Sequence, residues 1–235
     1  MAAEAHSTAT LRLTVGDLRI VHPITVPSAP VPATDVVPAL QALVNAVVAA
    51  AEAGLMKSGE AISCRKGCGA CCRQLVPVSR TEGERLLALV ETMAVERRDR
   101  LQARFATAQA MLDDAGLSNR AGRSDRELSL AYFALAIPCP FLEDESCSIH
   151  PDRPLVCREY LVTSPAELCA GPSQEGVTPV AVPKVSMAAR GLQDDGEDWF
   201  PLAGLMTWAA TRPRSDVRRT GPEWVQRFLK GIGRK

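Results

Sequence analysis

Near its start, the chain alternates apolar and polar side chains on both sides of a short break. The alternating apolar residues are Leu11, Leu13, Val15, Leu18 and Ile20. Gly16 and Asp17 form the break, and two runs of period two joined by such a pair are typical of a β-hairpin. We therefore predict an N-terminal hairpin. A stiff, extended connector that contains four prolines follows it, at positions Pro23, Pro27, Pro30 and Pro32.

Further along, apolar residues recur at helical spacing. They predict a helix over about 36–55, capped by Asp35 and ended by Gly54, and a helical stretch that begins at a Ser79/Glu82 capping box and runs to about Asp114. Shorter helices are expected at about 125–136, 202–211 and 221–230. The charged run 96–100 predicts either a solvated helix face or a break between two helices. Residues 177–185 predict an edge strand or an extended strap.

These elements predict a mainly α-helical protein with small β elements, of the α+β class, whose helices pack around a cysteine-rich loop region. We divide the chain into a hairpin and connector over 1–34, a helical cysteine-rich domain over 35–170, and a C-terminal region over 171–235 that packs on the core. In the C-terminal region, an acidic loop is expected over 194–198, and Trp199, Trp208 and Trp224 are expected to be core or lid residues.

Composition narrows the class of protein. Hydrophobic residues make up 46% of the 235, so a sizeable core is available. The 27 basic and 27 acidic side chains balance, which argues against a nucleic-acid partner. The N-terminus lacks the pattern of a signal peptide, and the most apolar stretch, 36–51, is interrupted by polar residues and Pro38. We therefore expect a cytoplasmic protein with no membrane partner.

The strongest chemical signal is the clustering of eight cysteines. The candidate metal ligands are Cys64, Cys68, Cys71, Cys72, Cys139, Cys147, Cys157 and Cys169. In a reducing cytosol, clustered thiols more often bind metal than form disulfides. Four thiolates complete one tetrahedral zinc site or one cubane cluster, so eight are enough for two complete sites.

The two groups of cysteines differ in setting. The first occupies a short loop with Gly67 and Gly69, whose glycines permit positive φ angles. The second is spread over 139–169, which is rich in proline and poor in periodicity, so bound metal is a candidate for what organises it. Neighbouring side chains such as Cys71 and Cys72 tend to diverge, so each is expected to serve one of two nearby sites, or both to bridge two irons. Overall, the two groups are expected to converge on one or two neighbouring sites.

These residues resemble the CxxCxxCC family of the YkgJ type, whose members are described as chelating zinc or iron. The resemblance covers about 60–170 and rests on the eight cysteines, on 139–142 and on 147–160. Two departures are visible: the gap after Cys64 has three residues rather than two, and His150 stands where a tyrosine is common. His150 is expected to fill that tyrosine position, with an added ligand as the alternative. Arg153 and Arg158 are expected either to bond backbone and lie near the thiolates, or to form surface ion pairs.

Several functions remain open at this point. The first is a protein that holds iron, such as a 4Fe–4S cluster, with zinc as the alternative. Iron is preferred because the cysteine spacing is not that of a zinc ribbon. The second is an enzyme, since some relatives resemble flagellin lysine methylases that use a cluster with S-adenosylmethionine. A structural zinc module is the third. A radical S-adenosylmethionine enzyme is disfavoured because Ala70 replaces the usual aromatic residue, and a cysteine hydrolase because histidines are few. Metal is the expected partner; no protein partner is indicated.

Overall fold

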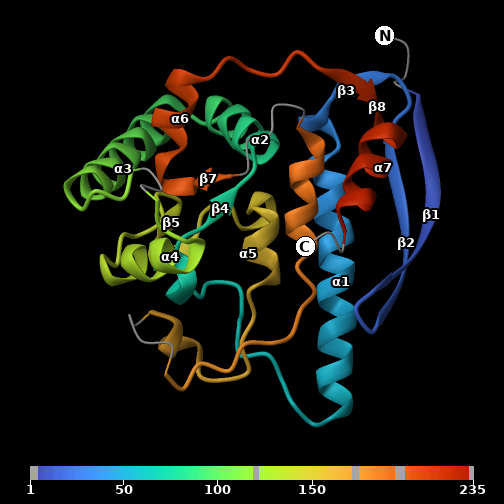
Figure 1. Ribbon diagram of the computed structural model, residues 1–235, viewed down its shortest axis with the longest axis horizontal. Coiled ribbons are helices and arrows are strands. Elements are labelled where there is room, and N and C mark those ends of the chain that lie inside the picture. Colours follow the sequence, from blue (N-terminus) through green and yellow to red (C-terminus); the bar gives the residue numbers. More distant parts are fainter. Residues whose placement is uncertain (1–4, 119–121, 171–174, 194–198, 233–235) are drawn as a thin grey trace.

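The computed structural model describes residues 5–118, 122–170, 175–193 and 199–232. As predicted, the protein is mainly helical with small two-stranded sheets. Figure 1 shows two sides joined along the middle: the N-terminal hairpin, α1 and α7 lie on one side, and α2, α3, α4 and α6 on the other. The predicted acidic loop at 194–198 lies outside the described residues.

The N-terminal hairpin is confirmed and is longer than its alternating core. Strand β1 (His6–Val15) pairs antiparallel with β2 (Leu18–Pro27), and Gly16 takes a φ of 57° in the turn. The proline-rich stretch is extended, as predicted, but it is part of two sheets rather than a separate connector. Pro23 and Pro27 belong to β2, and β3 (Pro30–Pro32) pairs with β8 (Arg218–Thr220). Proline is tolerated there because each sheet has only two strands, so every strand is an edge.

Helix α1 (Val37–Lys57) follows, but its predicted ends were wrong. Asp35 lies in a 3-10 turn (Ala33–Asp35), and no side chain caps the helix, which instead carries Pro38 in its first turn. Gly54 is inside the helix, which ends at Lys57 with Ser58 as its C-cap, and Gly59 follows with a φ of 81°. By length and composition alone, the 21 residues of α1 could cross a membrane. The buried core helix of a globular protein meets the same two criteria. Its inward face, from Leu40 to Ala51, is buried in the protein.

The predicted stretch from 79 to 114 is two helices, α2 (Arg80–Glu91) and α3 (Val95–Asp114). The capping box of Ser79 and Glu82 is confirmed. The break falls at 92–94, so the charged run 96–100 lies inside α3 rather than between helices. Helix α4 (Asp125–Ala134) begins at a second capping box, formed by Ser124 and Glu127.

The C-terminal region packs across both sides. Residues 177–185 form an extended strap with a single bridge between Val162 and Pro179, and a 3-10 helix, η5 (Val185–Leu192), follows it. Strand β7 (Phe200–Pro201) pairs with β4 (Pro77–Val78). The two predicted helices are present as α6 (Leu205–Thr211), after the turn Leu202–Gly204, and α7 (Gly221–Gly231). Trp224 of α7 is fully buried, as expected for a core residue.

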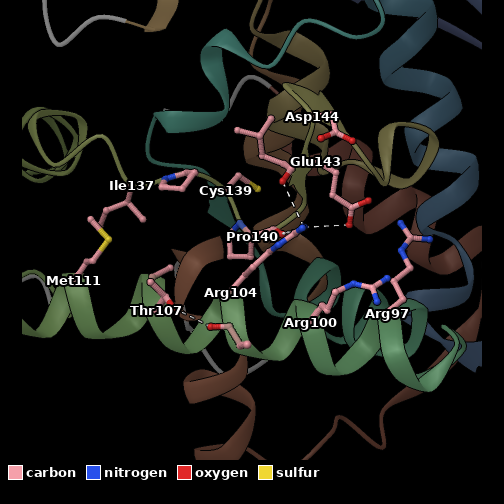
Figure 2. A pocket seen from close by; sticks show the side chains of 14 residues that line it. Arg97, Arg100, Arg104, Thr107, Met111, Ile137, Cys139, Pro140, Glu143 and Asp144 are labelled. Carbon is pink, nitrogen blue, oxygen red and sulfur yellow. Dashed lines mark hydrogen bonds and ion pairs between the residues drawn. The ribbon is translucent and has the colours of Figure 1, made fainter.

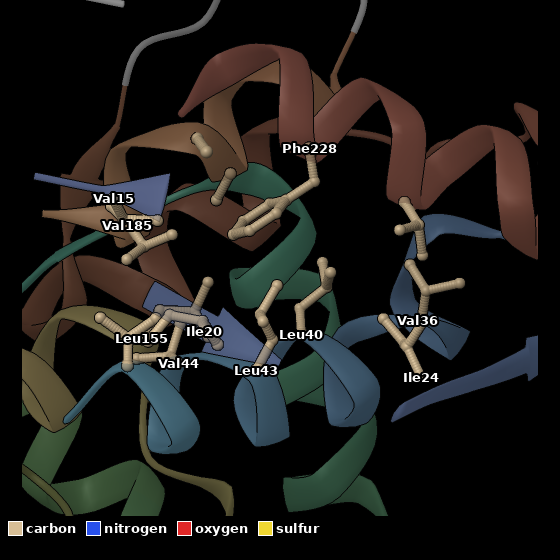
Figure 3. Close-up of a cluster of buried hydrophobic side chains, with 14 of the residues drawn as sticks. Val15, Ile20, Ile24, Val36, Leu40, Leu43, Val44, Leu155, Val185 and Phe228 are labelled. Carbon is tan, nitrogen blue, oxygen red and sulfur yellow. The ribbon is translucent and has the colours of Figure 1, made fainter. Parts of the chain in front are cut away.

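Three clusters of buried apolar side chains stabilise these elements. The largest joins the hairpin, α1, η5 and α7, with Leu40, Leu43 and Phe228 at its centre (Figure 3). The second joins α2, α3 and α6 around Phe105 and Phe141, and the third lies between α3 and α4. Apolar burial in these clusters stabilises most of the helical framework. Cys64, Cys139 and Cys147 pack against the edges of the first two clusters.

Candidate metal centre

The first cysteine group lies on a loop between α1 and β4. Cys71 and Cys72 are in a 3-10 helix, η2 (Ala70–Arg73), and Gly67 takes a φ of 89° in the turn before it. Gly69 lies so close to the second group that a Cβ atom there would approach the carbonyl oxygen of Glu145 to 2.5 Å. Glycine at 69 therefore sets how tightly the two groups pack.

The second group is distributed over a loop and three short elements. Cys139 precedes a small hairpin of β5 (Leu142–Glu143) and β6 (Ser146–Cys147), whose turn places Asp144 and Glu145 at positive φ. After the 3-10 turn η3 (His150–Asp152), Cys157 lies in α5 (Leu155–Glu159). Cys169 lies in the 3-10 helix η4 (Ala166–Ala170). The low periodicity of this segment reflects these short turns.

Hydrogen bonds and an ion pair join the two groups directly. The backbone N–H of Cys139 donates to the carbonyl oxygen of Cys72 at 2.7 Å. At the start of the first loop, Ser63 donates from its backbone N–H to the carbonyl oxygen of Val162 at 2.9 Å. Arg73 forms a bidentate ion pair with Glu145, with N–O distances of 2.9 and 2.6 Å. Segments far apart in sequence are thus held side by side.

The thiols themselves interact electrostatically, with Cys71 at the centre. Burial raises the pKa of Cys64, Cys139, Cys147, Cys157 and Cys169, and the negative charge of Cys71 raises each of them further. For Cys139 the pKa reaches about 12. Charge repulsion from Cys68 also raises the pKa of Cys64 and Cys169. Members of both groups therefore lie within electrostatic range of one another, as the expectation of convergence requires.

Cys71 and Cys72 do not diverge as expected for neighbours. Their thiols share a hydrogen bond, which is the largest cause of the raised pKa of Cys71, ahead of burial. All eight cysteines are free thiols.

Backbone N–H groups point at several of the sulfurs. Phe141 donates to Cys139 and Ile149 donates to Cys147, in both cases from two residues further along the chain. Val162 donates to Cys64 from the segment that Ser63 also contacts. These hydrogen bonds lower the pKa of the thiols and stabilise the thiolate, the form that binds metal.

Arg153 supplies the positive charge of the centre. Its guanidinium lowers the pKa of Cys64, Cys71, Cys147 and Cys157, which includes cysteines of both groups. The buried Nε of Arg153 has no hydrogen-bond acceptor among the described residues. A buried N–H without an acceptor is costly, and a negatively charged sulfur would satisfy it.

His150 contacts this arginine rather than adding to the sulfur donors. Its Nε2 lies 2.8 Å from Nη1 of Arg153, and burial followed by the charges of Arg153 and Arg158 lowers the pKa of its imidazole. The neutral ring can therefore accept from Arg153. In this arrangement His150 orients Arg153.

Arg158 follows the first of its two expected roles, bonding backbone near the thiols. It is only 4% exposed and donates from Nε to the carbonyl oxygen of Arg153 at 3.1 Å and from Nη1 to Oδ1 of Asn45 at 3.1 Å. Its charge also lowers the pKa of Cys147. It thus fixes the turn that carries Arg153 and ties that turn to α1.

Two further anchors were missed by the sequence reading. Glu82 is buried and accepts a 2.9 Å hydrogen bond from the backbone N–H of Leu155, at the start of the helix that carries Cys157. Tyr160 bonds to Cys169 and accepts from Nε2 of Gln74. The capping-box pattern found Glu82 as a helix cap, but no local pattern indicates its second, long-range partner.

The donor set suits a thiophilic metal, since all the clustered donors are sulfur. Among the described residues, no three His, Cys, Asp or Glu side chains are already spaced to bind one ion. The thiols therefore share one region without being closed around a single point.

Comparison with known proteins agrees with this chemistry. Residues 63–175 match the model of the CxxCxxCC family, described as a "putative zinc- or iron-chelating domain". No curated protein and no solved structure matches the chain. The matched range begins one residue before Cys64, ends after Cys169 and includes every cysteine of the chain. Residues 63–175 of this protein therefore carry the CxxCxxCC domain, and the description of its family supports metal binding.

Proposed function

We propose that the eight cysteines bind iron as an iron–sulfur centre, and that this centre is the functional cofactor of the protein. The observation that carries the proposal is the direct contact of the two groups, in which the backbone N–H of Cys139 donates to the carbonyl oxygen of Cys72 at 2.7 Å. One zinc ion is saturated by four thiolates, so a single structural zinc leaves half of this linked set unused.

The environment of the sulfurs supports the same choice. Iron–sulfur centres are stabilised by hydrogen bonds to their sulfurs. Phe141, Ile149 and Val162 already donate such bonds, and the buried Nε of Arg153 is free to donate another.

The test is the metal and sulfide content of protein purified without oxygen. The proposal expects iron with acid-labile sulfide, a brown colour, and loss of that colour in Cys71→Ser. A colourless protein with stoichiometric zinc would instead establish the structural zinc module. Protein that binds neither metal after reconstitution would refute the metal centre altogether. Free thiols also require a reducing compartment, so we propose the cytoplasm as its location.

A further inference from the structure

A cavity of about 520 Å³ lies beside the cysteine centre, between α3 and residues 137–144. Cys139, one of the eight candidate ligands, forms part of its wall. The volume falls within the range of pockets that hold small organic molecules, about 300–1,000 Å³. Figure 2 shows Met111 and Ile137 at one end of the cavity and Arg97 and Arg100 at the other, with Cys139 between them.

The two ends differ in chemistry. The first end is apolar, with Met111 and Ile137 facing each other across it. The second carries arginines from one face of α3, because positions 97, 100 and 104 are spaced by three and four residues. An elongated molecule with an apolar body and a charged group at one end fits this division.

The arginines have different tasks within the wall. Arg104 is structural: it donates from Nη1 to Oε1 of Glu143 at 3.1 Å and to the carbonyl oxygens of Pro140 and Leu142, so it holds the opposite wall in place. Arg97 donates from Nη2 to the carbonyl oxygen of Ser148 and keeps its positive charge uncompensated. In the described part of the chain, Arg100 has neither a hydrogen bond nor an ion pair with another residue.

The acidic residues of the cavity do not cancel this charge. Glu143 is neutralised by Arg104. Asp144 remains, on the wall opposite two arginines, and is exposed to solvent. The charged end therefore keeps one net positive charge from Arg97, Arg100 and Asp144. An anionic group is favoured there over a cationic one.

The wall opposite α3 is also held in an unusual backbone conformation. Ala136 and Asp144, which bracket it, have φ angles of 49° and 48°, a region that non-glycine residues rarely adopt. Asp144 takes it as a turn residue of the β5–β6 hairpin, and Ala136 takes it where the chain leaves α4, so the neighbouring elements impose both.

We propose that this cavity binds a small organic anion, a carboxylate or a phosphate on an apolar body. Its anionic group lies against Arg97 and Arg100, and its body lies against Cys139. The position of this anion next to a metal centre rests on the function proposed above. Its binding to the cavity does not depend on that function. The CxxCxxCC domain would then be a ligand-responsive centre rather than a metal store alone.

The experiment measures the binding of four naphthalene probes to the full chain by calorimetry. The probes are 2-naphthoate, 2-naphthyl phosphate, neutral 2-naphthamide and cationic 2-naphthylmethylamine. The two anions separate a carboxylate site from a phosphate site. We expect at least one anion to bind at least about fivefold more tightly than the amide, and the amine to bind most weakly, as an ion pair of roughly 1 kcal/mol gives.

Matched variants then locate the site. Arg97→Ala and Arg100→Ala are each expected to remove most of the preference for the anion, whereas Arg98→Ala, on the same helix but outside the cavity wall, leaves it unchanged. Ala103→Trp is expected to fill the cavity and abolish the binding of all four probes. Equal affinities for anion and amide, tighter binding of the amine, equal losses in Arg98→Ala and Arg100→Ala, or no saturable binding of any probe would each overturn the proposal.

A second readout separates this proposal from that of the metal centre. In metal-loaded protein, the anion is expected to shift the visible spectrum of the centre through its contact with Cys139, and Arg100→Ala is expected to reduce the shift at equal probe concentration. Probe binding by a protein that takes up no metal even after reconstitution would confirm the cavity and refute the metal centre. A metal centre whose spectrum responds to no probe would refute the placement of the occupant against Cys139.

Discussion

The backbone N–H of Cys139 donates a 2.7 Å hydrogen bond to the carbonyl oxygen of Cys72. This bond links the backbones of the two cysteine groups directly. It places the turn before β5 against η2, the short helix that carries Cys71. The metal-binding chemistry of the domain thus depends on a tertiary contact and not on one continuous motif.

Gly69 is the position most sensitive to that contact. In Gly69→Ala the new Cβ would meet the carbonyl oxygen of Glu145 and the side chain of Leu142, both at 2.5 Å. We expect a loss of about 1–3 kcal/mol of stability, as in overpacked sites, together with weaker metal retention. The free energy of unfolding and the metal content after dialysis measure the two effects.

Gly54→Ala is the matched control for Gly69→Ala. Gly54 is inside α1, and a Cβ there meets nothing within 4 Å. Alanine should therefore stabilise the helix by about 0.5–1 kcal/mol without changing the metal content. Normal metal retention in Gly69→Ala would show that close packing of the two groups is unnecessary.

Arg153 is expected to support metal binding by its charge. Arg153→Met removes a positive charge that faces cysteines of both groups. We expect metal affinity to fall about 10-fold or more, the usual effect of losing a group that stabilises metal ligands. Arg153→Lys keeps the charge and should fall between Arg153→Met and wild type. Competition with a chelator gives the affinities.

The exposed Arg126 of α4 provides the control for this series. Arg126→Met makes the same change of charge outside the centre and should leave the affinity unchanged. An equal loss in Arg126→Met and Arg153→Met would assign the effect to net charge, against the role given to Arg153.

Glu82 predicts a pH dependence of stability. Burial raises the pKa of its carboxyl above 4.5, against the smaller opposing effects of its hydrogen bonds to Leu155 and Ser79 and of the Arg158 charge. An acid whose pKa is raised in the folded state holds its proton more tightly there than in the unfolded state. The folded state therefore loses stability as the pH rises from the unfolded pKa of 4.5 through the higher folded pKa. The stability of wild type relative to Glu82→Gln should therefore fall between acidic and neutral pH.

Glu127 occupies the same capping-box position in α4 and gives the opposite sign. It is exposed, and hydrogen bonds from Ser124 lower the pKa of its carboxyl below 4.5. The stability of wild type relative to Glu127→Gln should therefore rise with pH over the acidic range and level off above 4.5. Urea unfolding at a series of pH values measures both differences, and the same trend for both variants would contradict the assigned environments.

Metal removal should loosen the cysteine segments locally. The three apolar clusters do not require metal, so α1 and α3 should keep their helical signal and their hydrogen-exchange protection. Residues 64–73 should lose protection most, because no apolar side chain among them is fully buried. Residues 139–170 should lose less, since Phe141 and Ile149 are buried in the second cluster. Exchange measured by mass spectrometry with and without chelator tests this. Global loss of protection would show instead that metal holds the whole fold.

The sequence predicted those elements that local physics determines. The hairpin about Gly16, the capping box of Ser79 and the two C-terminal helices all follow from spacing within a short window. The errors came from tertiary context. The predicted connector became part of two sheets because β8, far along the chain, pairs with β3, and Gly54 stays helical because α1 packs on the core.

The candidate site divides in the same way. The sequence identified the eight cysteines as thiol donors and assigned Arg158 a backbone role as one of two alternatives. It could not identify the second partner of Glu82 or the cavity beside Cys139, since each depends on segments that meet only after folding. Cys71 and Cys72, which were expected to diverge, instead share a hydrogen bond between their thiols.

The central claim is that cysteines from both groups form one metal centre. The most direct test is the metal content of two serine variants prepared without oxygen, C64S/C68S/C71S/C72S and C139S/C147S/C157S/C169S, with the helical signal recorded to confirm folding. Our account predicts that each variant loses the metal of the wild-type protein, because either group alone is incomplete. Full metal content in either variant would contradict it.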